Sequence, residues 1–71
     1  MIASTGPDLR YGVQLDNGRL ITGSRKHVLE AAVYAWKNRD VGVSLWIVPG
    51  KTDIIRKQRV ERLRSDYMNA L

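Results

Sequence analysis

Apolar and polar residues alternate strictly near the beginning of the chain. Leu9, Tyr11, Val13 and Leu15 are separated from one another by single polar residues or glycine. A period of two is typical of a β-strand with one buried side. The pattern therefore predicts a first strand that runs up to the following turn.

A turn and a return strand follow. Asn17-Gly18 is the dipeptide that tolerates positive φ at both centres of a type I′ hairpin turn, and residues 19–22 can form the second strand. A two-residue turn at this position places Leu15 opposite Leu20. Ile21 is then expected to point to the other side of the hairpin.

The spacing changes to that of a helix after Gly23-Ser24. Ser24 is a suitable N-cap for a helix that runs to about Asn38, with an apolar stripe of Leu29, Ala32, Val33 and Trp36. Residues 41–48 are rich in β-branched and aromatic side chains, end at a Pro-Gly turn and predict a third strand.

The last segment admits two interpretations. Val60, Leu63, Tyr67 and Leu71 form a helical stripe that Ile54 and Ile55 do not join. Either residues 53–57 form a short fourth strand and the helix begins near Gln58, or the two isoleucines pack separately at the start of a longer helix. We favour the short strand.

The predicted order is therefore β-β-α-β-(β)-α, an α+β fold. It comprises a small antiparallel sheet, one helix on the face of that sheet and a basic amphipathic helix at the C-terminal end. Residues 1–8 are expected to be a flexible arm, and residues 9–71 a single domain.

The composition offers little catalytic chemistry. The chain has 71 residues, no cysteine and one histidine, His27, so a thiolate zinc site or a histidine pair is excluded. No phosphate-binding glycine loop or nucleophile motif is present. We expect a protein that is not an enzyme, without cofactor or metal, and no small-molecule substrate is evident.

Positive charge is concentrated toward the C-terminal end. The net charge is +5, and residues 51–71 hold six basic and three acidic residues. A dense set could contact nucleic-acid phosphates: Arg56, Lys57, Arg59, Arg62 and Arg64. The same residues could instead solvate the flanks of the helix, with pairing of Lys57 to Glu61 and of Arg62 to Asp66.

Surplus apolar side chains suggest a second kind of site. If Val41, Val43, Leu45 and Ile47 face the first helix, then Trp46 and Val48 face away from it, together with Ile21. Either the last helix covers them, or they form a surface for a partner. Tyr34 is expected to be partly exposed. The candidate partner-binding residues are Tyr34, Trp46, Ile21, Val48 and Tyr67.

The first hairpin segment has the sequence Arg10-Tyr11-Gly12-Val13-Gln14-Leu15-Asp16-Asn17-Gly18-Arg19. It is followed by Leu29-Glu30-Ala31-Ala32 and then by an apolar strand. Over residues 10–48 this combination resembles small accessory proteins of actinobacterial bacteriophages. The resemblance implies binding to a host or phage protein, sometimes with inhibition of host growth. The same start also resembles the arm-binding domain of phage integrases, although here only two strands precede the helix.

Our expectation is a non-enzymatic protein-interaction module that binds a host or phage protein, with homodimerisation as a further expectation. The alternative is a small DNA- or RNA-binding protein that uses the C-terminal helix. No segment suggests a targeting signal or a membrane span, and a cytoplasmic location, in the host if the protein is phage-encoded, is predicted.

Overall fold

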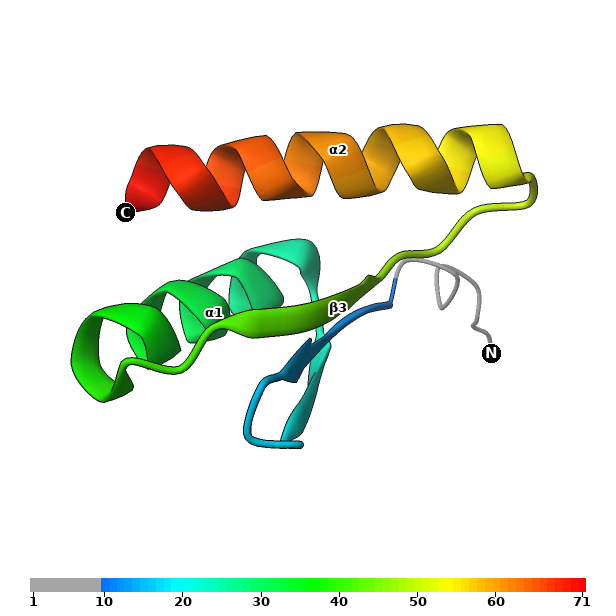
Figure 1. Ribbon diagram of the computed structural model, residues 1–71. Helices are drawn as coiled ribbons and strands as arrows, with labels where there is room; N and C mark the ends of the chain where they lie inside the picture. Colours follow the sequence, from blue (N-terminus) through cyan, green and yellow to red (C-terminus); the bar gives the residue numbers. More distant parts are fainter. Residues whose placement is uncertain (1–9) are drawn as a thin grey trace.

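Three strands and two helices make up the computed structural model, which describes residues 10–71 (Figure 1). The elements are β1 (Tyr11–Leu15), β2 (Leu20–Gly23), α1 (Arg25–Arg39), β3 (Val43–Ile47) and α2 (Asp53–Ala70). This order, β-β-α-β-α, confirms the α+β class with a small antiparallel sheet. The predicted arm, residues 1–8, lies outside the described residues.

The central strand of the sheet is β1, and the strand order is β2-β1-β3 with both neighbours antiparallel. Val13 of β1 pairs with Ile21 on one side and with Trp46 on the other. Directly paired residues project to the same face of a sheet. This face therefore carries the core, where Val13 is fully buried against residues of both helices.

The hairpin closes through a three-residue loop, so the predicted type I′ turn and its register are wrong. The Leu15 N–H donates to the Arg19 carbonyl at 2.8 Å, and the Gly18 N–H donates to the Leu15 carbonyl at 2.9 Å. Within this loop only Gly18 has a positive φ, of 90°. Asp16 is the first residue of this loop, and its N–H donates to the Gly42 carbonyl, just before β3, at 3.0 Å. Ile21 consequently faces the core.

The first helix begins and ends with recognisable caps. The Ser24 hydroxyl accepts a hydrogen bond from the His27 N–H at 3.1 Å, as its sequence position predicts. Asp40 adopts the left-handed conformation with φ of 59°, and its N–H donates to carbonyls of the last turn. The buried stripe is Val28, Ala32 and Ala35, whereas Trp36 remains 44% exposed.

The second helix begins at Asp53, so the predicted short strand over residues 53–57 is wrong. The Thr52 hydroxyl caps it by accepting a hydrogen bond from the Ile55 N–H at 3.2 Å. An N-cap followed by acidic Asp53 favours helix at this point more than two β-branched residues favour strand. Ile54 is left 70% exposed on the first turn.

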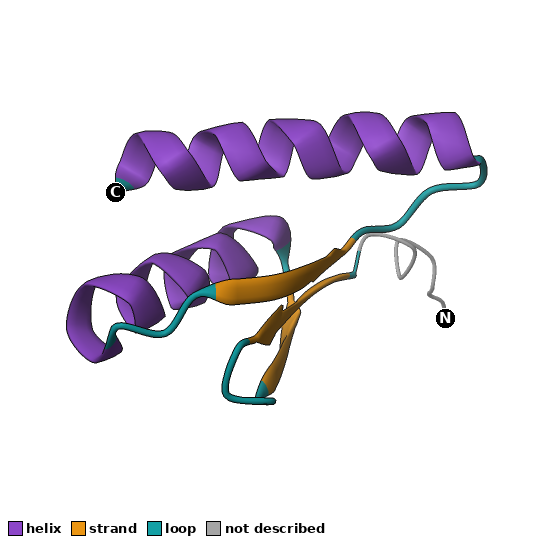
Figure 2. Cartoon of the chain, viewed as in Figure 1, coloured by secondary structure: helices purple, strands orange, loops and turns teal. Residues whose placement is uncertain are grey.

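Both helices cover the same face of the sheet, as Figures 1 and 2 show. A register shift in β3 explains why Trp46 points inward, contrary to prediction. Val43 pairs with Leu15 and Leu45 pairs with Gln14, so Ser44 is an extra residue in the strand. The bulge reverses the alternation after Val43. Trp46 then joins the core, while Leu45 and Ile47 turn to the open face.

Candidate functional site

Most of the predicted partner-binding residues lie inside the fold. Val48 and Tyr67 are each only 9% exposed, while Ile21 and Trp46 are partly buried against the core cluster. Tyr34 alone among the five is exposed, at 57%. The structure therefore does not bring the five together as one surface, and packing by the last helix accounts for Trp46.

The predicted basic set on α2 divides into two groups. Arg56 and Arg59 donate to the carbonyls of Gly50 and Pro49 at 2.7 and 2.6 Å, and thereby fix the loop that precedes α2. Lys57, Arg62 and Arg64 are exposed. Residues seven apart lie on one side of a helix, so Lys57 and Arg64 share a flank and Arg62 occupies another.

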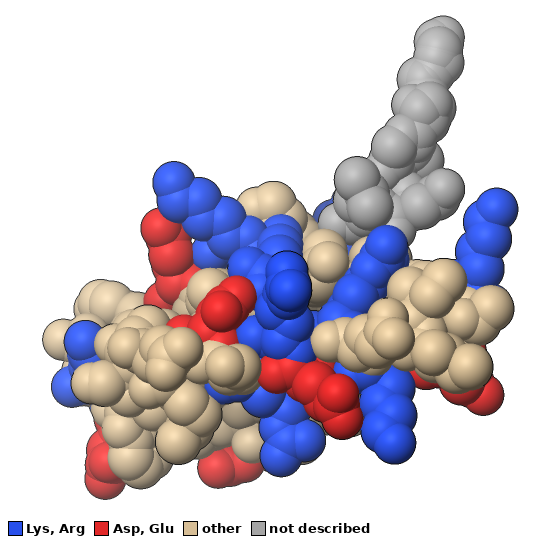
Figure 3. Space-filling view, turned by 90° about the horizontal axis from the view of Figure 1, so that it is seen from above, with Lys and Arg blue, Asp and Glu red and all other residues tan. Residues whose placement is uncertain are grey.

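The space-filling view shows Lys and Arg interleaved with Asp and Glu over the surface seen from the α2 side (Figure 3). Two ion pairs occur in the described part of the chain, Arg25–Asp66 and Arg56–Asp53. The predicted pairing of Arg62 with Asp66 is therefore wrong, and Lys57 forms no pair with Glu61. Asp66 instead connects α2 to the start of α1, a partner 41 residues away along the chain.

An open strand edge is the first feature that the sequence did not indicate. In the sheet of residues 10–71, β3 is an edge strand, with β1 on its inner side. Its sequence, Val-Ser-Leu-Trp-Ile, has no lysine or proline, the residues that commonly protect an edge from further pairing. On the open face beside this edge, Leu45 and Ile47 are 53% and 42% exposed.

A groove of about 310 Å³ runs between this edge and α2. Its lining comprises Val43, Ser44, Leu45, Trp46, Val60 and Arg64. The groove thus combines an unpaired backbone edge, an apolar floor and one exposed cation. Such a combination can hold an extended peptide through main-chain hydrogen bonds, with side-chain selection by the groove.

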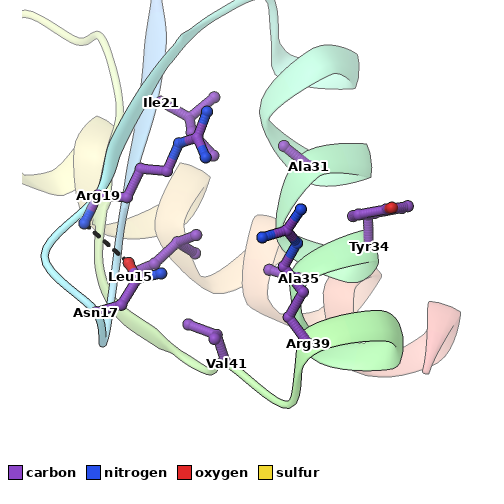
Figure 4. A pocket seen from close by; sticks show the side chains of 9 residues that line it. All are labelled: Leu15, Asn17, Arg19, Ile21, Ala31, Tyr34, Ala35, Arg39 and Val41. Atoms are coloured by element: carbon purple, nitrogen blue, oxygen red, sulfur yellow. Dashed lines mark hydrogen bonds between the residues drawn. The ribbon is translucent and has the colours of Figure 1, made fainter.

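A second cleft, of about 270 Å³, lies between the tip of the hairpin and α1 (Figure 4). Its apolar lining is Leu15, Ile21, Ala31, Ala35 and Val41, and its polar lining is Asn17, Arg19, Tyr34 and Arg39. The sequence predicted no site at this position. Local sequence patterns do not indicate the cleft, because it depends on the loop that brings Arg19 opposite the end of α1.

The buried face holds one titratable group with a shifted pKa. Burial raises the pKa of the Tyr67 phenol, and the negative charge of Asp16 raises it further. Within residues 10–71, no three His, Asp or Glu side chains gather as a metal site would require. Neither of the described helices is long and apolar enough to cross a membrane. No family model, curated protein or solved structure matches the chain.

Proposed function

We propose that this chain is a non-enzymatic protein-interaction module that binds an extended, acidic segment of a partner protein along β3. The observation that carries the proposal is the unprotected edge of β3 beside the groove that Arg64 lines. Strand addition supplies affinity through main-chain hydrogen bonds, and neighbouring side chains supply specificity. This mode needs no catalytic group.

The geometry of a strand predicts the pattern of the ligand. Side chains of an added strand alternate between the two faces of the sheet. Those on the open face would lie beside Leu45 and Ile47, which favours aliphatic residues. Those on the other face would enter the groove toward Val60 and Arg64, which favours acidic residues. The proposed ligand is a segment in which aliphatic and acidic residues alternate.

Charge favours an acidic partner over a second copy of this chain. A two-fold dimer built by antiparallel pairing of β3 would place the α2 flanks of both copies on the same face of the joined sheet. Lys57 and Arg64 would then approach the same cations of the other copy, and juxtaposed like charges oppose association. The net charge of +5 instead attracts an acidic protein.

The resemblance of residues 10–48 to phage accessory proteins supports a host or phage protein as this partner, encountered in the host cytoplasm. Inhibition of host growth would follow if the captured segment belonged to an essential protein. Nucleic-acid binding through Lys57, Arg62 and Arg64 is the competing function, and the following experiment separates the two.

The test is fluorescence anisotropy with three labelled ligands: a peptide that alternates valine with glutamate, the same peptide with lysine for glutamate, and a mixed-sequence DNA duplex. We expect the glutamate peptide to bind best. Arg64→Glu should weaken it by roughly tenfold or more, since attraction becomes repulsion. Arg62→Glu, on the other flank of α2, is the matched control and should have a smaller effect.

Amide protection adds a readout that charge alone would not produce. If the peptide pairs with β3, hydrogen exchange should slow at amides of β3 that point away from β1. Equal binding of both peptides would contradict the proposal. Preferential binding of the duplex, with affinity that falls steeply as salt increases, would favour the nucleic-acid alternative instead.

A further inference from the structure

We infer that the cleft between the hairpin tip and α1 is a binding site for a carboxylate carried on a small apolar body. This site is separate from the proposed strand-addition surface. The cleft is lined by the hairpin, by α1 and by Val41, whereas the groove is lined by β3 and α2, and no residue lines both.

The floor of the cleft suits the apolar part of such a ligand. Leu15 and Ala35 are each only 4% exposed, and Ile21, Ala31 and Val41 are partly buried around them. Figure 4 shows these side chains on the hairpin, on α1 and on the segment that follows α1, around the cleft. An apolar group that enters this space loses contact with water on several sides.

Two arginines supply the charge at the mouth. Arg19 comes from the end of the hairpin loop and Arg39 from the last turn of α1, and Figure 4 shows their side chains on opposite sides of the cleft. Neither forms an ion pair with a residue of the described chain. The cleft lining contains no Asp or Glu. The guanidinium fork matches a carboxylate with two parallel hydrogen bonds, so an anion between these residues would be held from either side.

The backbone positions of both arginines are fixed by the fold. The Arg19 N–H donates to the Asn17 side-chain oxygen at 2.9 Å, and the Arg19 carbonyl accepts from the Leu15 N–H at 2.8 Å. Arg39 immediately precedes the left-handed Asp40 that ends α1. Little main-chain ordering is therefore required when a ligand binds, which favours affinity.

Phenylacetate is a suitable probe, because it joins one carboxylate to one compact apolar ring. Titration into the full chain, followed by ¹H–¹⁵N NMR, should shift amides of Ala31, Ala35 and Val41. Phenylacetamide has the same shape without the charge and should bind at least roughly tenfold more weakly. Shifts of equal size at equal concentration of the two probes would overturn the inference, as would an absence of shifts at millimolar phenylacetate.

Variants assign the binding to the two arginines. Arg19→Gln and Arg39→Gln should each weaken phenylacetate binding by roughly tenfold, the loss expected for a charge-assisted hydrogen bond. Lys37→Gln removes the same charge from α1 at an exposed position outside the cleft and should leave binding unchanged. Both arginines are exposed, so the fold should survive, which circular dichroism can verify. Equal affinity in all three variants would overturn the inference.

The carboxylate could belong to a free metabolite or to the C-terminus of a protein. A tripeptide that ends in phenylalanine, tested with a free and with an amidated C-terminus, separates these sources. Tighter binding of the free-acid peptide than of phenylacetate would support the site and assign it to a protein terminus. Tighter binding of phenylacetate would support the site and assign it to a small molecule.

Discussion

Trp46 and Tyr67 meet edge to face, with their ring centroids 5.4 Å apart and their planes inclined at 70°. This contact joins β3 to α2, two elements that follow one another in the chain. It holds α2 on the face of the sheet that α1 already covers, and it closes the core around Val13. The same contact leaves the outer edge of β3 beside a groove instead of beneath a helix.

The aromatic contact should contribute measurably to stability. Tyr67→Leu keeps an apolar side chain but removes the edge-to-face pair, and we expect the free energy of unfolding to fall by at least about 1 kcal/mol. Urea unfolding followed by far-ultraviolet circular dichroism measures the change. Trp36→Leu removes an aromatic ring that is 44% exposed and serves as the control, with a smaller expected loss. Comparable losses would show that the pair has no special part in stability.

Tyr67 should also make stability depend on pH in the alkaline range. Its pKa is raised by burial and by Asp16, so the folded chain keeps the phenol proton at pH values where the unfolded chain has lost it. The unfolded phenol titrates near about pH 10. The contribution of the Tyr67 phenol to the free energy of unfolding is therefore fully present below that pH. It decreases as the pH rises from there through the higher pKa that the phenol has in the folded chain. Denaturation of Tyr67→Phe at a series of pH values should show a smaller alkaline decrease than the original chain.

The cap at Thr52 should decide where α2 begins. Thr52→Ala removes the acceptor for the Ile55 N–H, and we expect a loss of about 1 kcal/mol with faster hydrogen exchange in the first turn of α2. Thr52→Ser retains the hydroxyl and should behave almost like the original chain. If hydrogen exchange is unchanged in Thr52→Ala, the cap does not determine where the helix begins. The hydrogen bonds from Arg56 and Arg59 to the Gly50 and Pro49 carbonyls would then determine it.

Local patterns in the sequence were sufficient for much of the fold. The alternation before Leu15 and the Ser24 cap predicted β1 and α1, and the stripe that includes Leu63 and Tyr67 predicted the buried side of α2. Each of these signals depends on residues close together in the chain. The class and order of elements followed from them.

Contacts between distant residues determined what the sequence did not predict. Asp16, the extra residue of the hairpin loop, bonds to Gly42, and the bulge at Ser44 reverses the faces of β3. Ile21 and Trp46 were therefore assigned to the wrong side of the sheet. Val48 and Tyr67 are buried, so they do not form a surface with Tyr34. The cleft between the hairpin tip and α1 is another such case. Arg39, at the end of α1, lines this cleft only because the hairpin loop lies opposite the end of the helix.

The bulge in β3 is itself open to test, because a side-chain hydrogen bond is formed at its extra residue. The Ser44 hydroxyl donates to the Asp16 carboxylate at 2.5 Å, between the extra residue of β3 and the extra residue of the hairpin loop. If this bond stabilises both irregularities, Ser44→Ala and Asp16→Ala should be coupled in a double-mutant cycle by about 0.5–1.5 kcal/mol. Near-ultraviolet circular dichroism should change with either variant, since Trp46 faces the core only when the bulge is present. Additive effects of the two substitutions on unfolding would show that the bulge is set by the backbone alone.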